Sequence, residues 1–203
     1  MHQYLTPSEI RLRVYVISSA VALLSAWLLS QLIAGIPFPI PWYVDTPSVL
    51  AFLGLYLFLY DRLLWKAWPF RAIPWMHVPN LSGSWDVCIR TSHEEFGSSR
   101  LGTATIRQSF SKISILLDFP LSSSHSLAAS LLRDDALSPF ELLYHYQSNP
   151  RPEAPSTMAI HYGTTRLILS DDSSCLSGDY YTGRGRLNYG SIEFKRGTDV
   201  QAA

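Results

Sequence analysis

Residues 14–36 read VYVISSAVALLSAWLLSQLIAGI, a run without a charged side chain and with a single amide, Gln31. About 20 apolar residues in a helix are enough to cross the hydrocarbon core of a bilayer. A cleaved signal peptide has a shorter apolar stretch, of about 7–15 residues, which ends in a small-residue cleavage site. This run is longer and is followed by a second apolar segment. It therefore predicts a transmembrane helix over residues 14–36.

The second apolar segment covers residues 47–65, PSVLAFLGLYLFLYDRLLW. The prolines between the two segments end the first helix, because proline lacks the amide donor and clashes with the preceding turn. Asp61 and Arg62 interrupt the second segment near its end, where a long cationic side chain reaches the interface. We expect a second transmembrane helix here.

The positive charges predict the orientation of both spans. Arg11 and Arg13 precede the first span, and Arg62, Lys66 and Arg71 end or follow the second, whereas the loop between the spans has no Lys or Arg. Positive charge marks the cytoplasmic side. The predicted organisation is a cytoplasmic N-terminus at 1–13, spans at 14–36 and 47–65 around an external loop at 37–46, a linker at 66–78, a cytoplasmic ligand-binding barrel at 79–196 and a tail at 197–203.

Small residues recur every four positions on the first span, at Ser18, Ala22 and Ala26. Such a face lets two helices approach closely in lipid. The pattern leaves two alternatives open: packing within the hairpin of the two spans, or assembly between protomers.

Beyond residue 79 the apolar residues alternate with polar ones, as in Leu81–Arg90. This period of two is typical of strands with one buried face. Seven further segments read as strands: Leu101–Phe110, Lys112–Phe119, Ser124–Arg133, Phe140–Ser148, Met158–Ser170, Cys175–Thr182 and Gly190–Arg196. Eight short strands separated by turn residues predict a small eight-stranded antiparallel β-barrel, and the whole chain a membrane-anchored all-β protein.

The composition excludes several functions. Lys and Arg together number 16, as do Asp and Glu, so no basic field predicts a DNA or RNA partner. Cys88 and Cys175 lack neighbours at metal-ligand spacing, so no metal site is predicted. The chain has no nucleophile elbow, zinc-binding helix motif or P-loop and is not predicted to be an enzyme.

Residues 176–186, LSGDYYTGRGR, carry two tyrosines and two arginines between glycines. Arginine forks pair with phosphate and tyrosine faces stack on bases, so the stretch fits a nucleotide ligand. A solvated glycine-rich hairpin is the alternative.

The chain resembles the two-transmembrane, β-strand-rich effectors associated with bacterial CD-NTases in cyclic-oligonucleotide antiphage signalling (CBASS). The likeness rests on the N-terminal hairpin followed by residues 80–85 (NLSGSW), 105–115 (TIRQSFSKISI), 144–150 (YHYQSNP), 161–163 (HYG) and 178–184 (GDYYTGR). Phe110 stands where the family pattern has Trp.

The resemblance implies that the barrel binds a cyclic dinucleotide made by a partner CD-NTase after phage infection. Binding would then drive self-association and disruption of the bacterial inner membrane, which kills the cell. No cofactor is implied besides this signalling ligand. Within the matching motifs we selected as candidate ligand contacts Trp85, Gln108, Ser126, Tyr144, Tyr146, Asn149, His161, Tyr180, Thr182 and Arg184.

Two other functions compete with this one. An eight-stranded barrel that opens on Trp85 also resembles lipocalins, so a membrane-anchored lipid-binding protein is one alternative. A membrane hydrolase built from Ser126, His161 and an aspartate is the other, because catalytic triads assemble in space. Arginines beside aromatic strands favour a phosphate ligand over an acyl chain.

Overall fold

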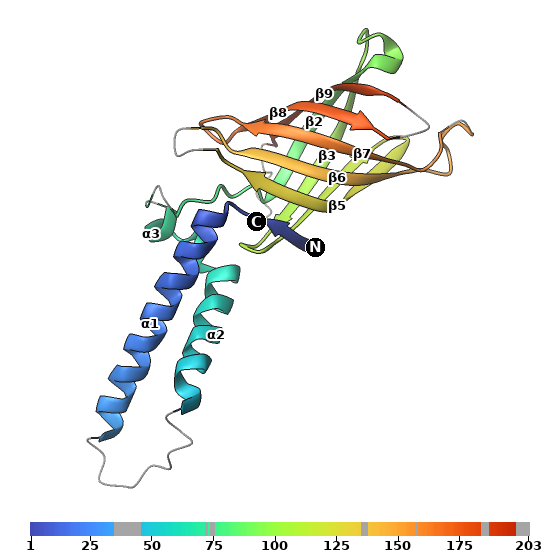
Figure 1. The fold of residues 1–203 in the computed structure, drawn as a ribbon. Coiled ribbons are helices and arrows are strands. Elements are labelled where there is room, and N and C mark those ends of the chain that lie inside the picture. Colours follow the sequence, from blue (N-terminus) through green and yellow to red (C-terminus); the bar gives the residue numbers. More distant parts are fainter. Residues whose placement is uncertain are drawn as a thin grey trace, which may run out of the picture. The chain divides into compact units, whose positions relative to one another are not determined.

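The computed structural model describes residues 1–34, 46–71, 73, 76–134, 138–156, 158–183 and 187–197 (Figure 1). The chain forms two compact units. One is the helical segment Ser8–Val78, and the other combines Met1–Pro7 with the chain from Pro79 onward.

The helical unit contains α1 (Ser8–Ala34), α2 (Thr46–Arg62), the 3-10 turn η2 (Leu64–Lys66) and the short α3 (Trp68–Arg71). The predicted apolar helix near the N-terminus is confirmed. Among the described residues, the segment Ser8–Ile33 alone has both the length and the apolar composition of a membrane span. Helix α2 is apolar but has only 17 residues.

The small face of α1 packs within the helix pair. Helices α1 and α2 contact each other, and the Ser25 and Tyr56 hydroxyls lie 2.8 Å apart across the pair. Ala22, one turn before Ser25, is fully buried. Of the two alternatives that the sequence left open, the structure therefore shows contact within the hairpin. Large apolar side chains such as Leu24 and Trp27 remain exposed on other faces of α1.

In the part of the chain that the structure describes, the second unit is a closed β-barrel of nine strands. They are β1 (His2–Leu5), β2 (Gly83–Thr91), β3 (Ser99–Gln108), β4 (Lys112–Phe119), β5 (Ser122–Leu132), β6 (Glu141–Pro150), β7 (His161–Leu169), β8 (Cys175–Thr182) and β9 (Tyr189–Arg196). Strands β2 to β9 form a meander of antiparallel neighbours, and β9 returns to β2. Figure 1 shows β5 to β9 crossing in front of β2 and β3.

The prediction of eight antiparallel strands was wrong by one strand. Strands β4 and β5 pair directly only near their connecting turn, between Leu116↔His125 and Phe119↔Ser122. Farther from the turn, β1 enters between them. It runs antiparallel to β4, with His2 opposite Ile113, and parallel to β5, with Tyr4 opposite Ala129. A four-residue strand is too short to show alternation, and both partners lie more than a hundred residues away in the sequence.

Apolar side chains fill one end of the barrel. Trp85 and Phe194 are fully buried, with ring centroids 6.5 Å apart. Around them lie Leu81, Ile106, Ile113, Ile115, Leu142, Leu167 and Leu176, all at most 1% exposed. Burying each such side chain stabilises the fold by roughly 1.5–3 kcal/mol. The inward positions at the other ends of the same strands carry aromatic, hydroxyl and glycine residues.

Candidate ligand-binding cavity

A cavity of about 440 Å³ lies within the barrel. This volume is within the range of roughly 300–1,000 Å³ that is typical of small-molecule sites. Its lining combines apolar, aromatic and polar side chains: Ile89, Thr91, His93, Arg100, Leu101, Leu117, Phe119, Pro120, Leu121, Ser122, Ser124, Tyr146, Ser148, Met158, His161, Thr165, Tyr180, Thr182 and Asn188.

Strand register brings the polar part of this lining together. On neighbouring strands β6 and β7, Ser148 is opposite His161, and on β7 and β8, Thr165 is opposite Tyr180. Paired residues on adjacent strands point to the same face of the sheet, and alternate residues share that face. The inward rows of β6, β7 and β8 therefore converge on one volume.

Glycines on neighbouring strands leave room for three aromatic rings of the lining. A Cβ atom added to Gly163 would lie 2.5 Å from Cζ of Tyr146, and one added to Gly190 would lie 2.8 Å from Cε1 of Tyr180. Gly102 makes the same room for Phe119, whose Cδ1 would lie 2.5 Å from the added atom. The positions of these three rings thus depend on the absence of a side chain on the next strand.

The lining carries one arginine, Arg100, among the described residues. Its Nε donates to Oε1 of Glu94 at 3.0 Å, and its Nη2 bonds to the same oxygen. Glu94 belongs to the 3-10 turn η3 (Ser92–Glu94), and its other carboxylate oxygen accepts from the Ser98 hydroxyl. The hydrogen bonds from Arg100 and then Ser98 hold the pKa of Glu94 below its usual range.

Two hydroxyls at the inner part of this region are buried without a hydrogen-bond partner. They belong to Thr165, which lines the cavity, and to Tyr144, which pairs with Thr165 across β6 and β7. Burial raises the pKa of the Tyr144 hydroxyl far above its usual value, so it stays protonated, although the nearby Thr165 hydroxyl opposes that rise. The two groups are close but do not form a hydrogen bond of ordinary geometry. Of the two, only Thr165 belongs to the cavity lining, where its hydroxyl can bond to a water molecule or a ligand atom.

Four of the candidate residues line the cavity: Tyr146, His161, Tyr180 and Thr182. The His161 ring lies edge-on to Tyr146, with centroids 6.4 Å apart, and its Nδ1 is 3.1 Å from the Ala159 carbonyl oxygen. The Thr182 hydroxyl donates to the Asn188 carbonyl at 2.9 Å and accepts from the Asn188 amide at 2.7 Å.

Two other candidates make hydrogen bonds near the filled end. Trp85 Nε1 donates to the Leu81 carbonyl at 2.9 Å. Gln108 accepts from the Leu81 amide at 2.7 Å and donates to the Tyr4 hydroxyl at 2.9 Å and the Pro79 carbonyl at 3.2 Å.

The Ser126 hydroxyl accepts from the Ile115 amide at 3.0 Å and lies 2.7 Å from Nε2 of His2. Of the remaining candidates, Tyr144 is buried opposite Thr165 and outside the cavity lining, and Asn149 accepts from the Gln147 side chain at 2.8 Å. Arg184 lies outside the described residues.

Sequence reasoning missed His93 and Arg100 in the lining. Arg100 occupies the first inward position of β3, in a row with Gly102, Ala104 and Ile106. The alternation along β3 could have indicated Arg100, because every second residue from Ile106 back to Arg100 lies on the inner face of the strand.

Residues 76–196 match the family described as "Cap15, cyclic dinucleotide receptor domain". The chain belongs to the Cap15 family. The match spans all of the barrel except β1, and it confirms the resemblance to CBASS effectors with a cyclic-dinucleotide-sensing domain.

Two relatives carry the name CD-NTase-associated protein 15. The protein from Yersinia aleksiciae is 30% identical over 152 residues, which cover 73% of this chain and 71% of the relative. The protein from Staphylococcus schleiferi is 30% identical over 124 residues, or 61% of this chain and 64% of the relative.

Proposed function

We propose that the Cap15 barrel binds a cyclic dinucleotide in the 440 Å³ cavity and that binding activates a membrane-disrupting effector. The observation that carries this proposal is the lining itself. Within the receptor domain, aromatic rings, hydroxyls, two histidines and an arginine converge on one volume.

A cyclic dinucleotide needs flat apolar surfaces for two bases and donors for two phosphates. Tyr146, Tyr180 and Phe119 offer ring faces, on which bases stack with roughly 1–3 kcal/mol each. Arg100 offers a guanidinium edge for phosphate, and Thr165 a hydroxyl that lacks a partner. All ten candidate contacts stay predictions: Tyr146, His161, Tyr180 and Thr182 line the cavity, Trp85, Gln108, Ser126, Tyr144 and Asn149 do not, and Arg184 lies outside the described residues.

The two competing functions find less support. A lipid-binding barrel favours an aliphatic lining, whereas this cavity carries His93, Arg100 and His161. A hydrolase needs an accessible nucleophile beside its base. Ser126 is buried, lies outside the cavity lining and has His2 as its histidine partner. We therefore propose a receptor without catalytic activity.

The effector role that we propose requires a membrane anchor. We propose that α2 and the residues after it form a second span beside α1, with the barrel and both termini in the cytoplasm. The charges on Arg11 and Arg13 before the first span and on Lys66 after the second support this orientation. Ligand supplied by a CD-NTase would then promote self-association and loss of the inner-membrane barrier.

The test of the receptor function is a calorimetric titration of the full chain in detergent with cyclic di-AMP, cyclic di-GMP, cyclic GMP–AMP and cyclic di-UMP. Tyr180 and Tyr181 are neighbours on β8 and form a matched pair, because Tyr180 is 8% exposed and lines the cavity while Tyr181 is 54% exposed. Tyr180→Leu should weaken the tightest complex by about tenfold or more, and Tyr181→Leu should leave it unchanged. Failure of all four ligands to bind, or equal effects of the two variants, would reject the cavity as the receptor site.

A further inference from the structure

The guanidinium of Arg100 reaches the cavity rim with one edge already occupied. Both its Nε and its Nη2 bond to a single oxygen of Glu94. The Nε–Nη2 edge is one of the two edges with which arginine binds phosphate in a bidentate manner. A phosphate that approaches this edge therefore competes with the Glu94 carboxylate for the same donors.

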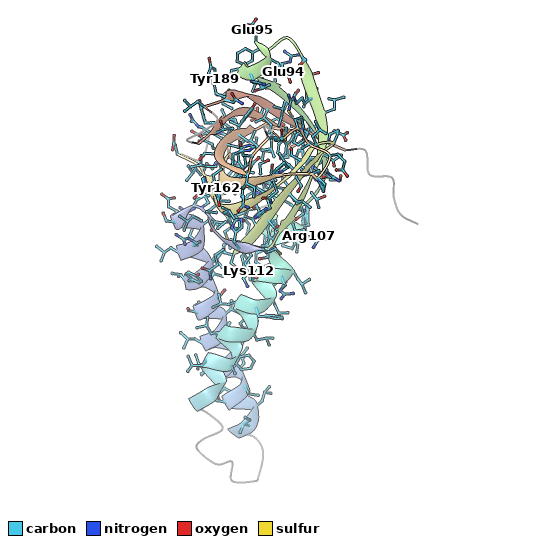
Figure 2. All side chains as sticks on the ribbon, turned by 90° about the vertical axis from the view of Figure 1, so that its right-hand side faces the viewer. Glu94, Glu95, Arg107, Lys112, Tyr162 and Tyr189 are labelled. Carbon is cyan, nitrogen blue, oxygen red and sulfur yellow. The ribbon has the colours of Figure 1, made fainter. Side chains whose placement is uncertain are left out.

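The turn that carries Glu94 is well fixed. The Thr91 hydroxyl oxygen accepts the His93 amide at 3.3 Å. Glu95 and Phe96 follow in the left-handed region, with φ of 49° and 61°, and the Phe96 ring contacts Tyr189 with centroids 6.0 Å apart. Figure 2 shows Glu94, Glu95 and Tyr189 at the same end of the barrel. The backbone of this turn thus presents Glu94 to Arg100 before any ligand arrives.

We propose that Glu94 is a resting counter-ion of Arg100 that a ligand phosphate displaces, so that Glu94 lowers the affinity of the sensor for its dinucleotide. This inference rests on the proposed cyclic dinucleotide function. Displacement is feasible because the pair is partly open to solvent: the side chains of Arg100 and Glu94 are 44% and 28% exposed. Ion pairs of this kind are weak and are screened by salt.

The consequence for the cell is that the sensor fills only at a higher concentration of the dinucleotide. A dianionic ligand has to compete with a carboxylate that is tethered beside the arginine, so more ligand is needed for the same occupancy of Arg100. Removing the carboxylate charge should therefore tighten ligand binding, which is the opposite of what removal of a ligand contact does.

The experiment compares Glu94→Gln with Glu95→Gln in the full chain, titrated with the tightest ligand of the four-member panel. Both variants remove one negative charge from the same turn, but Glu94 alone of the two bonds to Arg100 among the described residues. Glu94→Gln should bind about two- to fivefold tighter than Glu95→Gln, and the difference should shrink at high salt. Glu94→Ser repeats the charge removal if the Gln variant does not fold.

A double-mutant cycle assigns the effect to the ion pair. Arg100→Gln should weaken ligand binding. When added to Arg100→Gln, Glu94→Gln should raise the ligand affinity no more than Glu95→Gln does. Three results would overturn the inference: equal affinities of the two single variants, weaker binding by Glu94→Gln, or a gain that persists without Arg100. Each of these leaves the receptor function intact, whereas a wild-type protein that binds no member of the panel rejects both.

Discussion

At the scale of single residues, alternation along a strand predicts which side chains point inward but not what surrounds them. Tyr146 and Tyr180 are inward and line the cavity, while Trp85 and Gln108 are equally inward and belong to the filled end. The difference lies in how far along the barrel each residue sits, and that depends on the register of strands distant in sequence. This is why alternation could not separate the candidates that line the cavity from those in the filled end.

Gly163 provides the first residue-scale prediction. Where the backbone conformation suits alanine, exchanging glycine for alanine usually stabilises a protein by about 0.4–1 kcal/mol, because it lowers the conformational entropy of the unfolded chain. At Gly163 the new Cβ would lie 2.5 Å from Tyr146 Cζ and from the Tyr181 carbonyl oxygen, and overpacking of this kind costs about 1–3 kcal/mol. Gly163→Ala should therefore lower the thermal midpoint and weaken ligand binding, as measured by near-ultraviolet circular dichroism and titration.

Gly97 is the control, because its added Cβ would meet its nearest neighbour, the Glu94 carbonyl oxygen, at an ordinary 3.4 Å. Gly97→Ala should not lower the midpoint. A Gly163→Ala protein as stable as wild type would show that the Tyr146 ring is not held by this close approach.

At the scale of elements, the eight strands of the meander were predictable because each combines alternation with turn residues at its ends. Strand β1 was not, because it has four residues and is held by partners distant in sequence. Tyr4 is 6% exposed and its hydroxyl accepts from Gln108. Two residues, Thr6 and Pro7, separate the strand from α1, so it links the barrel to this apolar helix directly along the chain.

Deletion of residues 1–5 tests the role of β1. Without it, the backbone of β4 around Lys112–Ile113 and of β5 around Ala129–Ser130 loses its partner strand on one side. Amide hydrogen exchange should accelerate in these two segments, while the β8–β9 pair keeps its protection. Unchanged exchange in β4 and β5 would mean that they close the barrel without β1.

The turn between β7 and β8 makes a pH-dependent contribution. Asp172 accepts from the Ser170 hydroxyl at 2.7 Å and from the Ser174 hydroxyl and amide at 2.7 and 3.0 Å. These bonds lower the pKa of Asp172 to about 2, against about 4 in an unfolded chain. A lowered folded-state pKa stabilises the protein above about pH 4, and this stability is lost as the pH falls toward about 2.

Asp172→Asn isolates that contribution, since other carboxylates titrate equally in both proteins. Between about pH 5 and pH 2, the thermal midpoint of the wild type should fall farther than that of Asp172→Asn. Parallel curves would show that the turn does not bind the carboxylate more strongly than its protonated form.

At the scale of the whole molecule, the proposed effector has to connect ligand binding with membrane damage. Two helices enclose no aqueous path, because backbone exposed to lipid must remain helical, so damage requires several protomers. The buried Ser18–Ala22 face of α1 belongs to the hairpin, which leaves exposed residues such as Leu24 and Trp27 for contacts between protomers. Shifting assembly from 1:99 to 99:1 needs a preference of about 5.5 kcal/mol, which several ligated barrels can share.

Topology is tested by cysteine labelling in cells, with Cys88 and Cys175 replaced by serine. A membrane-impermeant reagent should label Asp45→Cys from outside, because residue 45 lies in the predicted external loop. It should reach Asp171→Cys, in the exposed β7–β8 turn, only after permeabilisation. Labelling of both positions in intact cells would place the barrel outside and contradict a cytoplasmic sensor.

The central claim is that the cavity, rather than the outer surface of the barrel, receives the dinucleotide. Photocrosslinking of the full chain with an azidoadenine analogue of cyclic di-AMP, followed by residue-level mass spectrometry, tests it most directly, with unmodified ligand as competitor. We predict competed labelling at Tyr146, His161 or Tyr180, which line the cavity. Competed labelling confined to Tyr162 and Tyr181, the exposed tyrosines on β7 and β8, would contradict the account.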